Sequence, residues 1–216
     1  MSLITLKNVK KEYGKNQVLF ENLSLEIEKG EFVGLVGKSG AGKTTLLNII
    51  GLITDISEGT ITIDGHQNLS MNGKNAMILR RYTIGYLFQN YGLIEDENVL
   101  WNLKLALEYK KIKREEKLKL INKYLKQFEL SDMLNKKVYQ LSGGEQQRIA
   151  IIKLILQGSQ IILADEPTSG LDKENELIVM KLLKELNEKG ITIIMVTHNM
   201  NLCDCFSRVI NVENFR

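Results

Sequence analysis

A glycine-rich stretch at residues 37–44 has the residue types and the spacing that bind a phosphate chain. It reads GKSGAGKT between an apolar run and a helical stretch, the setting that the pattern G-x-x-x-x-G-K-[ST] requires. Backbone N–H groups wrap the phosphates, Lys43 meets the β- and γ-phosphates, and the Thr44 hydroxyl can ligate Mg²⁺. The expected nucleotide-binding residues are Gly37, Lys38, Ser39, Gly40, Ala41, Gly42, Lys43, Thr44 and Thr45.

Two adjacent carboxylates follow a second apolar run, which ends at Ala164. The carboxyl ends of parallel strands lie at one edge of a sheet, so Asp165 and Glu166 are expected beside the phosphate loop. Asp165 is suited to hold Mg²⁺ directly or through water, and Glu166 is free to polarise an attacking water. Phosphoryl transfer needs positioning and charge stabilisation, and this division of roles supplies both.

A third pattern, Leu141–Glu145, reads LSGGE and precedes a long helical stretch. A small polar residue and two glycines at a helix start can form a second anion-binding site. The same residues also fit an N-cap followed by a flexible turn, and the residue types alone favour neither interpretation. The candidate residues are Ser142, Gly143 and Gly144.

The hydrophobic pattern predicts the elements that position these residues. Continuous apolar runs at Phe32–Val36, Ile161–Ala164 and Ile191–Val196 indicate parallel strands buried on both faces. Alternating residues near Ile4, Leu25 and Ile61 indicate antiparallel strands instead. Helices are expected at Thr44–Ile50, Glu145–Gln157 and Lys173–Lys189, the last closed by Gly190. The predicted fold is α/β, with a P-loop core around a parallel sheet and an antiparallel β subdomain at the N-terminus.

The segment from about Glu97 to Lys137 is helical in pattern, strongly charged and without strand candidates. We interpret residues of about 90–140 as a helical subdomain inserted in a single domain, 1–216. The chain has 29 basic and 26 acidic residues, a net charge of +3, which argues against nucleic acid as a partner. It contains no run of about eighteen apolar residues, so transport would require a membrane-spanning partner.

The order of the motifs resembles the nucleotide-binding domain of ATP-binding cassette (ABC) transporters over essentially the whole chain. Residues 37–44 match Walker A, Ile161–Glu166 match Walker B, and Leu141–Glu145 resemble the signature motif, with Glu145 where the family often has Gln. Residues 169–172 (SGLD) match the D-loop. By position, Gln89 resembles the Q-loop glutamine, His198 the switch histidine, and Tyr13 the aromatic residue that stacks on adenine.

The resemblance implies a head-to-tail homodimer that binds two ATP molecules with Mg²⁺. Each ATP would lie between Walker A of one chain and the signature of the other. Gln89 would touch the metal and the attacking water, and His198 the γ-phosphate, so the catalytic set is Glu166, His198 and Gln89. The metal ligands would be Thr44, Gln89 and Asp165. A lone Gln, His or Tyr is more often structural, and the resemblance alone supports these three roles.

Within the family, residues 48–52 (NIIGL) and 85–90 (GYLFQN) look like the macrolide-export and lipoprotein-release branch. Residues 86–95 further resemble bacteriocin-export ATPases. The implied partner is an integral membrane permease, which would hold the chain at the cytoplasmic face of the cell membrane. Its coupling helix could contact Tyr91, Leu93, Ile94, Val99, Leu100 and Trp101, although the same residues could pack the subdomain internally. Two other functions stay open: a regulatory ATPase that acts through a permease-like partner without transport, and a non-transport ABC ATPase.

Overall fold

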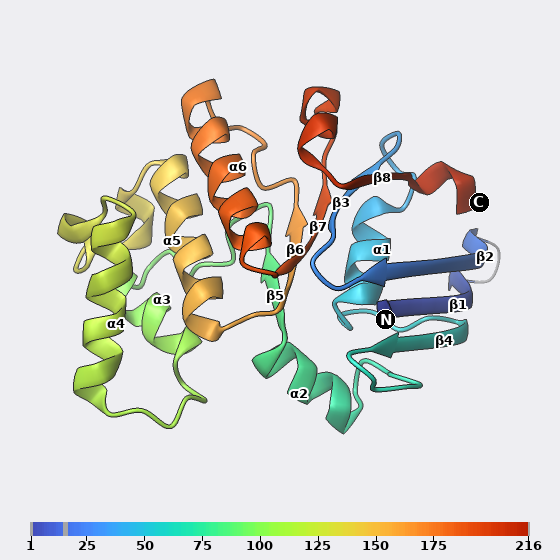
Figure 1. The fold of residues 1–216 in the computed structure, drawn as a ribbon, viewed down its shortest axis with the longest axis horizontal. Coiled ribbons are helices and arrows are strands. Elements are labelled where there is room, and N and C mark those ends of the chain that lie inside the picture. Colours follow the sequence, from blue (N-terminus) through green and yellow to red (C-terminus); the bar gives the residue numbers. More distant parts are fainter. Residues whose placement is uncertain (1, 15–16, 216) are drawn as a thin grey trace.

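The computed structural model describes residues 2–14 and 17–215 as two β-sheets surrounded by helices (Figure 1). The larger sheet has the strand order β5-β6-β7-β3-β8, and its strand pairs are all parallel. The strands are β3 (Phe32–Val36), β5 (Ile84–Leu87), β6 (Ile161–Asp165), β7 (Thr192–Val196) and β8 (Arg208–Asn211). The predicted α/β fold with a parallel sheet is therefore confirmed.

The continuous apolar runs are explained by burial on both faces of this sheet. In β6, Ile161 and Leu163 join one apolar cluster, whereas Ile162 and Ala164 join a second cluster on the other face. Successive side chains of a strand point to opposite faces, so a strand covered on both sides needs apolar residues throughout. The five-stranded sheet thus separates two hydrophobic cores.

The smaller sheet is antiparallel, as predicted, and its strands have the order β2-β1-β4. It consists of β1 (Ser2–Tyr13), β2 (Gln17–Glu28) and β4 (Glu58–Ile63), the first two longer than the predicted segments. Alternate residues of β2 are buried, among them Leu23, Leu25 and Ile27. This sheet and helix α1 (Lys43–Ile50) pack in the first apolar cluster, together with one face of the larger sheet.

The other helices are α2 (Lys74–Tyr82), α3 (Val99–Ala106), α4 (Arg114–Gln127), α5 (Gly143–Gln157) and α6 (Lys173–Glu188). Helix α5 begins two residues before the predicted Glu145, because Ser142 is its N-cap. Helix α6 ends one residue before the predicted Lys189, and Gly190 follows with a φ of 88°. Helix α1 begins one residue before the predicted Thr44, and the predicted helix positions are otherwise confirmed.

The charged segment before α5 is helical, with α3, α4 and two 3-10 turns at Ser131–Met133 and Val138–Gln140. Helices α3 and α4 pack on α5 in the second apolar cluster, on the opposite side of the larger sheet from α1 (Figure 1). An isolated antiparallel bridge between Asn98 and Lys137 closes the base of the segment. The boundaries of a subdomain at about 90–140 stay a prediction. In the described ranges no helix is both long and apolar enough to cross a bilayer.

Candidate nucleotide site at the strand ends

The predicted catalytic residues follow the carboxyl ends of neighbouring strands. The glycine-rich loop follows β3, Gln89 lies two residues after β5, Asp165 ends β6, and His198 lies two residues after β7. Parallel strands bring these ends to one edge of the sheet, which is where open α/β sheets bind ligands. The fold therefore collects residues that are up to 161 positions apart, from Gly37 to His198.

Residues 37–42 form a loop that holds the Lys43 ammonium. Lys43 Nζ donates to the carbonyl oxygens of Gly37 and Lys38 at 2.8 and 2.9 Å. Gly42 precedes α1 with a φ of 98°, and a Cβ atom there would lie 2.7 Å from Phe20 Cζ, so only glycine fits. The loop is folded around its lysine at the N-terminus of α1, as a phosphate site requires.

Burial lowers the pKa of Lys43, and the negative charges of Glu166, Asp165 and Glu213 partly oppose that shift. The ammonium is buried among carboxylates and carbonyl oxygens and lacks full hydration. A phosphate chain would give it strong charge-assisted hydrogen bonds in the same position. This environment fits the predicted role of Lys43 in binding the β- and γ-phosphates.

The predicted magnesium ligands Thr44 and Asp165 lie together. Thr44 Oγ1 donates to Asp165 Oδ1 at 3.2 Å. Burial raises the pKa of the Asp165 carboxyl, Glu166 adds to the rise, and the Thr44 hydrogen bond and Lys43 oppose it. A hydroxyl and a carboxylate at one point supply the hard oxygen ligands that Mg²⁺ takes beside a nucleotide. The pair therefore fits the metal.

Replacing Asp165 with Asn should stabilise the nucleotide-free protein. The raised pKa means that the folded state holds the Asp165 proton more tightly than the unfolded state, so ionised Asp165 costs stability. That cost appears as the pH rises through the range from the ordinary value of 3.8 to the raised one. Thermal melts should show a higher Tm for D165N at pH 7.5 and a smaller difference at pH 4.

The same variant should lose Mg²⁺-dependent ATP hydrolysis, because an amide is a poorer magnesium ligand than a carboxylate. Asp64→Asn, which lies after β4, is the matched control and should change neither property in this way. A lower Tm for D165N at pH 7.5 would contradict the electrostatic account.

Glu166 and His198 contact each other across the ends of β6 and β7. His198 Nε2 lies 2.8 Å from Glu166 Oε1. Glu166 has a φ of 48°, a left-handed conformation that is uncommon for a residue with a side chain. Its N–H is held by the carbonyl oxygen of Val196 at 3.1 Å, which fixes the strained turn. Backbone strain of this kind occurs often at functional sites.

Glu166 and His198 line a pocket of about 280 Å³ with residues of the glycine-rich loop. Tyr13, from the end of β1, lines the same pocket and is 45% exposed. Its hydroxyl lies 3.3 Å from Thr45 Oγ1, and Lys11 Nζ lies 4.8 Å from its ring centre. An exposed ring beside a phosphate loop can stack on a base. The structure thus brings Tyr13, residues of the phosphate loop, Glu166 and His198 into one pocket.

Gln89 is exposed and does not line this pocket, and neither does Asp165. Next to Gln89, the ring of Phe88 stacks on Tyr86 at 4.1 Å between centroids. Gln89 follows β5 at the correct edge of the sheet but is not part of the pocket that the phosphate loop lines. Its predicted contacts with metal and water stay predictions.

The signature residues lie at the N-terminus of α5, across the larger sheet from α1 (Figure 1). They do not line the pocket of the phosphate loop. Glu145 Oε2 accepts from Ser142 N–H at 2.7 Å and from Ser142 Oγ at 2.8 Å. Burial acts to raise the pKa of Glu145, but these bonds outweigh it and the pKa falls. Within one chain, Ser142 therefore acts as the N-cap of α5, which is one of the two interpretations of this motif. Its side chain stays exposed.

Two contacts hold the signature glycines against neighbouring elements. A Cβ atom on Gly144 would lie 2.1 Å from Asn175 Oδ1, which also accepts from Arg148 at 3.2 Å. A Cβ atom on Gly143 would lie 2.8 Å from the hydroxyl of Tyr91. Asn175 belongs to the first turn of α6, whose N-cap is Asp172. Leu171 of the D-loop lies close as well, with its Cδ2 atom 3.6 Å from a Cβ placed on Gly143, so the D-loop and the signature pack on each other.

Sequence reasoning missed three residues near the nucleotide pocket. Gln17 and Leu19 of β2 line it, and Glu213 acts electrostatically on Lys43. The position of Gln17 and Leu19 only four and six residues after Tyr13 was an available signal. The sequence held no signal for Glu213, because only the pairing of β8 with β3 brings the C-terminal segment to the phosphate loop.

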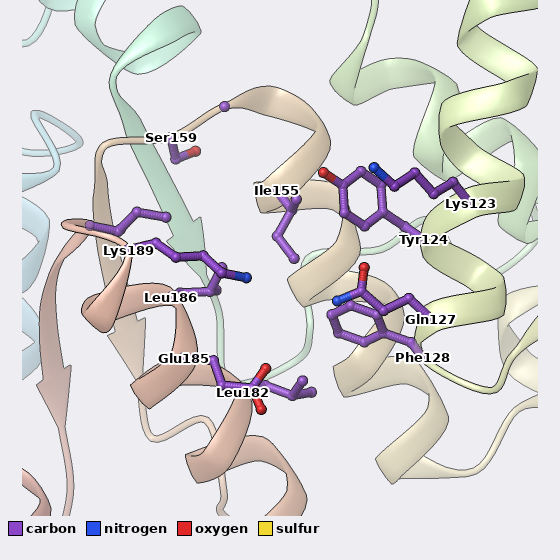
Figure 2. A pocket seen from close by; sticks show the side chains of 12 residues that line it. Lys123, Tyr124, Gln127, Phe128, Ile155, Ser159, Leu182, Glu185, Leu186 and Lys189 are labelled. Carbon is purple, nitrogen blue, oxygen red and sulfur yellow. The ribbon is translucent and has the colours of Figure 1, made fainter.

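A larger hollow, of about 410 Å³, lies away from these residues, between α4, α5 and α6. In Figure 2, Tyr124 and Phe128 on the α4 side face Leu182 and Leu186 of α6. Gly158 and Ser159, which precede β6, also line it, so it lies toward the opposite edge of the sheet. It contains none of the predicted catalytic or binding residues.

Comparisons with known proteins agree with the motif order. A family model described as ABC transporter matches residues 20–169. The macrolide export ATP-binding/permease protein MacB of Campylobacter jejuni is 41% identical over 98% of this chain. The matched region is 33% of the length of that relative. An uncharacterized ABC transporter ATP-binding protein of Methanocaldococcus jannaschii, MJ1508, is 41% identical over 98% of this chain and 96% of its own length.

Solved structures give the same result. The dimeric ABC transporter cassette MJ0796, in a post-hydrolysis state with ADP and Pi, has a TM-score of 0.87 and 39% identity, covering 96% of this chain and 93% of that one. The structure of cbiO1 from Clostridium perfringens, part of the ABC transporter complex cbiONQ, has a TM-score of 0.86 and 26% identity, covering 98% of this chain and 86% of that one. The predictions of an ABC-type fold and an ABC-type ATPase are confirmed. The chain belongs to the ABC transporter family and is an ATP-binding cassette of it.

Proposed function

We propose that this cassette hydrolyses MgATP as a homodimer at the cytoplasmic face of the membrane and powers an integral membrane permease that exports its cargo. The macrolide-export relatives carry ATP-binding and permease parts in one protein, and this chain matches about a third of their length. The similarity to MJ1508 over 96% of that ATP-binding protein supports a cassette that works with a permease on another chain. A bacteriocin, a peptide or a lipophilic molecule is the proposed cargo.

One observation carries the proposed dimer: the two predicted anion-binding elements of a single chain lie apart. The phosphate loop precedes α1 on one side of the larger sheet, and Ser142 caps α5 on the other. A head-to-tail pair would place Ser142 of one chain opposite Lys43 of the other. The dimeric form of MJ0796, at 39% identity, supports this arrangement.

In the proposed site, each residue has one task. Lys43 and the loop N–H groups bind the phosphates, Thr44 and Asp165 hold Mg²⁺, and Tyr13 stacks on the adenine. Glu166 takes the proton of the attacking water, and His198, now 2.8 Å from Glu166, is close enough to orient that carboxylate or to meet the γ-phosphate. Gln89, in the loop after β5, would complete the set by contacting the metal and the attacking water. Mg²⁺ supplies charge neutralisation at the phosphates.

Replacing Ser142 with Ala should block the ATP-bound dimer without weakening ATP binding to the monomer. The variant removes a hydroxyl that would donate to the phosphate bound by the partner chain, and a hydrogen bond to a charged group contributes about 1.5–3 kcal/mol. The ATPase rate should fall at least about tenfold. Size-exclusion chromatography with MgATP and a phosphate-release assay measure the two effects.

Ser142→Ala also removes a helix cap, which by itself costs about 1 kcal/mol of stability. Asn98→Ala is the matched control, because Asn98 caps α3 through a 2.8 Å bond to Trp101 N–H and lies outside the nucleotide pocket. It should retain the dimer and the ATPase rate. A wild-type ATPase rate for Ser142→Ala would rule out the two-chain site.

The proposal of a permease partner is tested by isolating the chain together with any membrane protein that binds it. The chain should be purified from its own cells in mild detergent, and the membrane protein that accompanies it should be identified. The complex is then reconstituted in vesicles, with ATP supplied on the cassette side, and solute movement is measured. Export that depends on ATP supports the proposal. ATP turnover without movement of any solute contradicts it and favours a regulatory ATPase.

A further inference from the structure

The end of β1 places a buried lysine against the aromatic ring of the nucleotide pocket. Lys11 is only 9% exposed, whereas Tyr13, two residues further along the strand, is 45% exposed and lines the pocket. The Lys11 Nζ atom lies over the Tyr13 ring, 4.8 Å from its centre, which is within the range of a cation–π contact. The site thus contains a cation to which neither the motifs nor the proposed mechanism gives a role.

The ammonium of Lys11 is held by the loop that follows α1. Its Nζ donates to the carbonyl oxygen of Asp55 at 2.7 Å and to Thr54 Oγ1 at 3.3 Å. The ion pairs of the described chain include none with Lys11. An ammonium has three N–H groups, so two reach these oxygens and the third can be directed at the face of the Tyr13 ring. Because a buried charge is costly without compensation, the ring contributes to the stability of Lys11 in this position.

The Tyr13 ring is also held at a second point. Its hydroxyl lies 3.3 Å from Thr45 Oγ1, in the first turn of α1. Contacts with the hydroxyl and with one face fix the position and the tilt of the ring before a nucleotide arrives. A cation over one face leaves the other face for a base. Such a prearranged platform loses less conformational entropy when it binds a ligand.

We infer that Lys11 is a positioning residue that sets the base preference of the nucleotide site, by holding one face of the Tyr13 ring so that the other face favours a purine. The inference rests on the proposed function, in which Tyr13 stacks on adenine. The face of an aromatic ring is negative, and the Lys11 charge draws its π electrons away from the opposite face. That face then attracts an electron-rich base more strongly. A purine has two fused rings and offers more stacking area and more electron density than a pyrimidine, so Lys11 should favour ATP over CTP.

Affinities for ATP, CTP and inorganic tripolyphosphate test the inference. They are measured by isothermal titration calorimetry in the presence of EDTA, so that no nucleotide is hydrolysed. Lys11→Met keeps the length and the apolar stem of the side chain and removes its charge. Affinity should fall about fivefold for ATP and less than about twofold for CTP, on the scale of a single cation–π contact. Affinity for tripolyphosphate, which has no base, should not change. The decisive quantity is therefore the ratio of the ATP and CTP affinities.

Matched variants separate this role from a general effect of charge or packing. Lys11→Arg keeps a cation that stacks on aromatic faces, so it should retain the wild-type ratio. Lys10→Met removes the same charge from the neighbouring residue, which pairs with Glu12 and Glu58 rather than with a ring, and should also retain the ratio. Because Lys11 acts through the ring, Lys11→Met should change nothing further in a Tyr13→Leu background. A lysine with a purely structural role would weaken binding in both backgrounds.

Each other outcome decides against a different part of the argument. A wild-type ratio for Lys11→Met, together with a lowered ratio for Tyr13→Leu, would overturn the inference and leave the proposed stacking role of Tyr13 intact. A wild-type ratio for Tyr13→Leu would show that the ring does not stack on the base, so that part of the proposed function fails and this inference fails with it. Equal losses for ATP, CTP and tripolyphosphate in Lys11→Met would show that the lysine acts on the phosphate loop, and would also overturn the inference.

Discussion

Replacing Glu166 with Gln is expected to leave ATP binding unchanged and to reduce ATP hydrolysis by roughly 10²- to 10⁴-fold, the range that a positioned general base contributes. The amide has the shape of the carboxylate but cannot take a proton from water. Because the side chain keeps its size beside His198 and its backbone stays in the same turn, the pocket should still fill with nucleotide. The variant should therefore accumulate as an ATP-bound dimer.

Equilibrium binding of a fluorescent ATP analogue, phosphate release and size-exclusion chromatography with MgATP measure the three expected results. Glu185→Gln is the control, because Glu185 lines the distant hollow between α4 and α6 and its replacement makes the same chemical change. If Glu166→Gln hydrolyses ATP at the wild-type rate, another group activates the water. A variant that binds no ATP would show instead that the strained turn at Glu166 shapes the pocket.

Lys43→Ala should act one step earlier, on nucleotide binding itself. The ammonium is held by two loop carbonyls and would exchange them for phosphate oxygens. Hydrogen bonds to a charged group contribute about 1.5–3 kcal/mol, which predicts a loss of ATP affinity of roughly 10- to 150-fold. The loss should be smaller for adenosine, which has no phosphates. Isothermal titration calorimetry with both ligands measures the difference.

Lys29→Ala removes the same charge at the other end of β3, before Phe32 rather than after Val36, and is the control. It should bind ATP like the wild type. An equal loss of affinity in the two lysine variants would reflect net charge alone. Retained affinity in Lys43→Ala would contradict the assignment of the phosphate loop.

The sequence predicted that the glycine-rich loop and the two acids after Ala164 lie at one edge of the sheet, because both signals are local. A glycine pattern between a strand and a helix, or two acids after an apolar run, needs no knowledge of distant contacts. Strands β5 and β8 and helix α2 were not predicted. Strands β5 and β8 have only four residues each, and α2 has two buried residues, too few for a clear hydrophobic period.

Long-range packing also explains what sequence reasoning could not place. Nothing near Gly144 in the sequence indicates that Asn175 lies against it, and nothing near Lys153 indicates that its half-buried ammonium donates to the carbonyl oxygen of Gly92. Val99, one of the residues considered for a partner surface, is an interior residue of α3. The hydrophobic pattern alone does not distinguish a residue that packs inside a subdomain from one that is exposed on a partner-binding surface.

The division of the hydrophobic core by the five-stranded sheet has a consequence for how such a protein can evolve. One cluster holds α1 and the antiparallel sheet, which shape the phosphate loop and the Tyr13 side of the pocket, and the other holds α3 and α4. Substitutions that repack α3 and α4 are separated from the first cluster by a layer of backbone, so their effects on stability should be nearly independent. Descendants of one ancestral cassette could therefore change the packing of α3 and α4 while inheriting the packing around α1 and the phosphate loop unchanged.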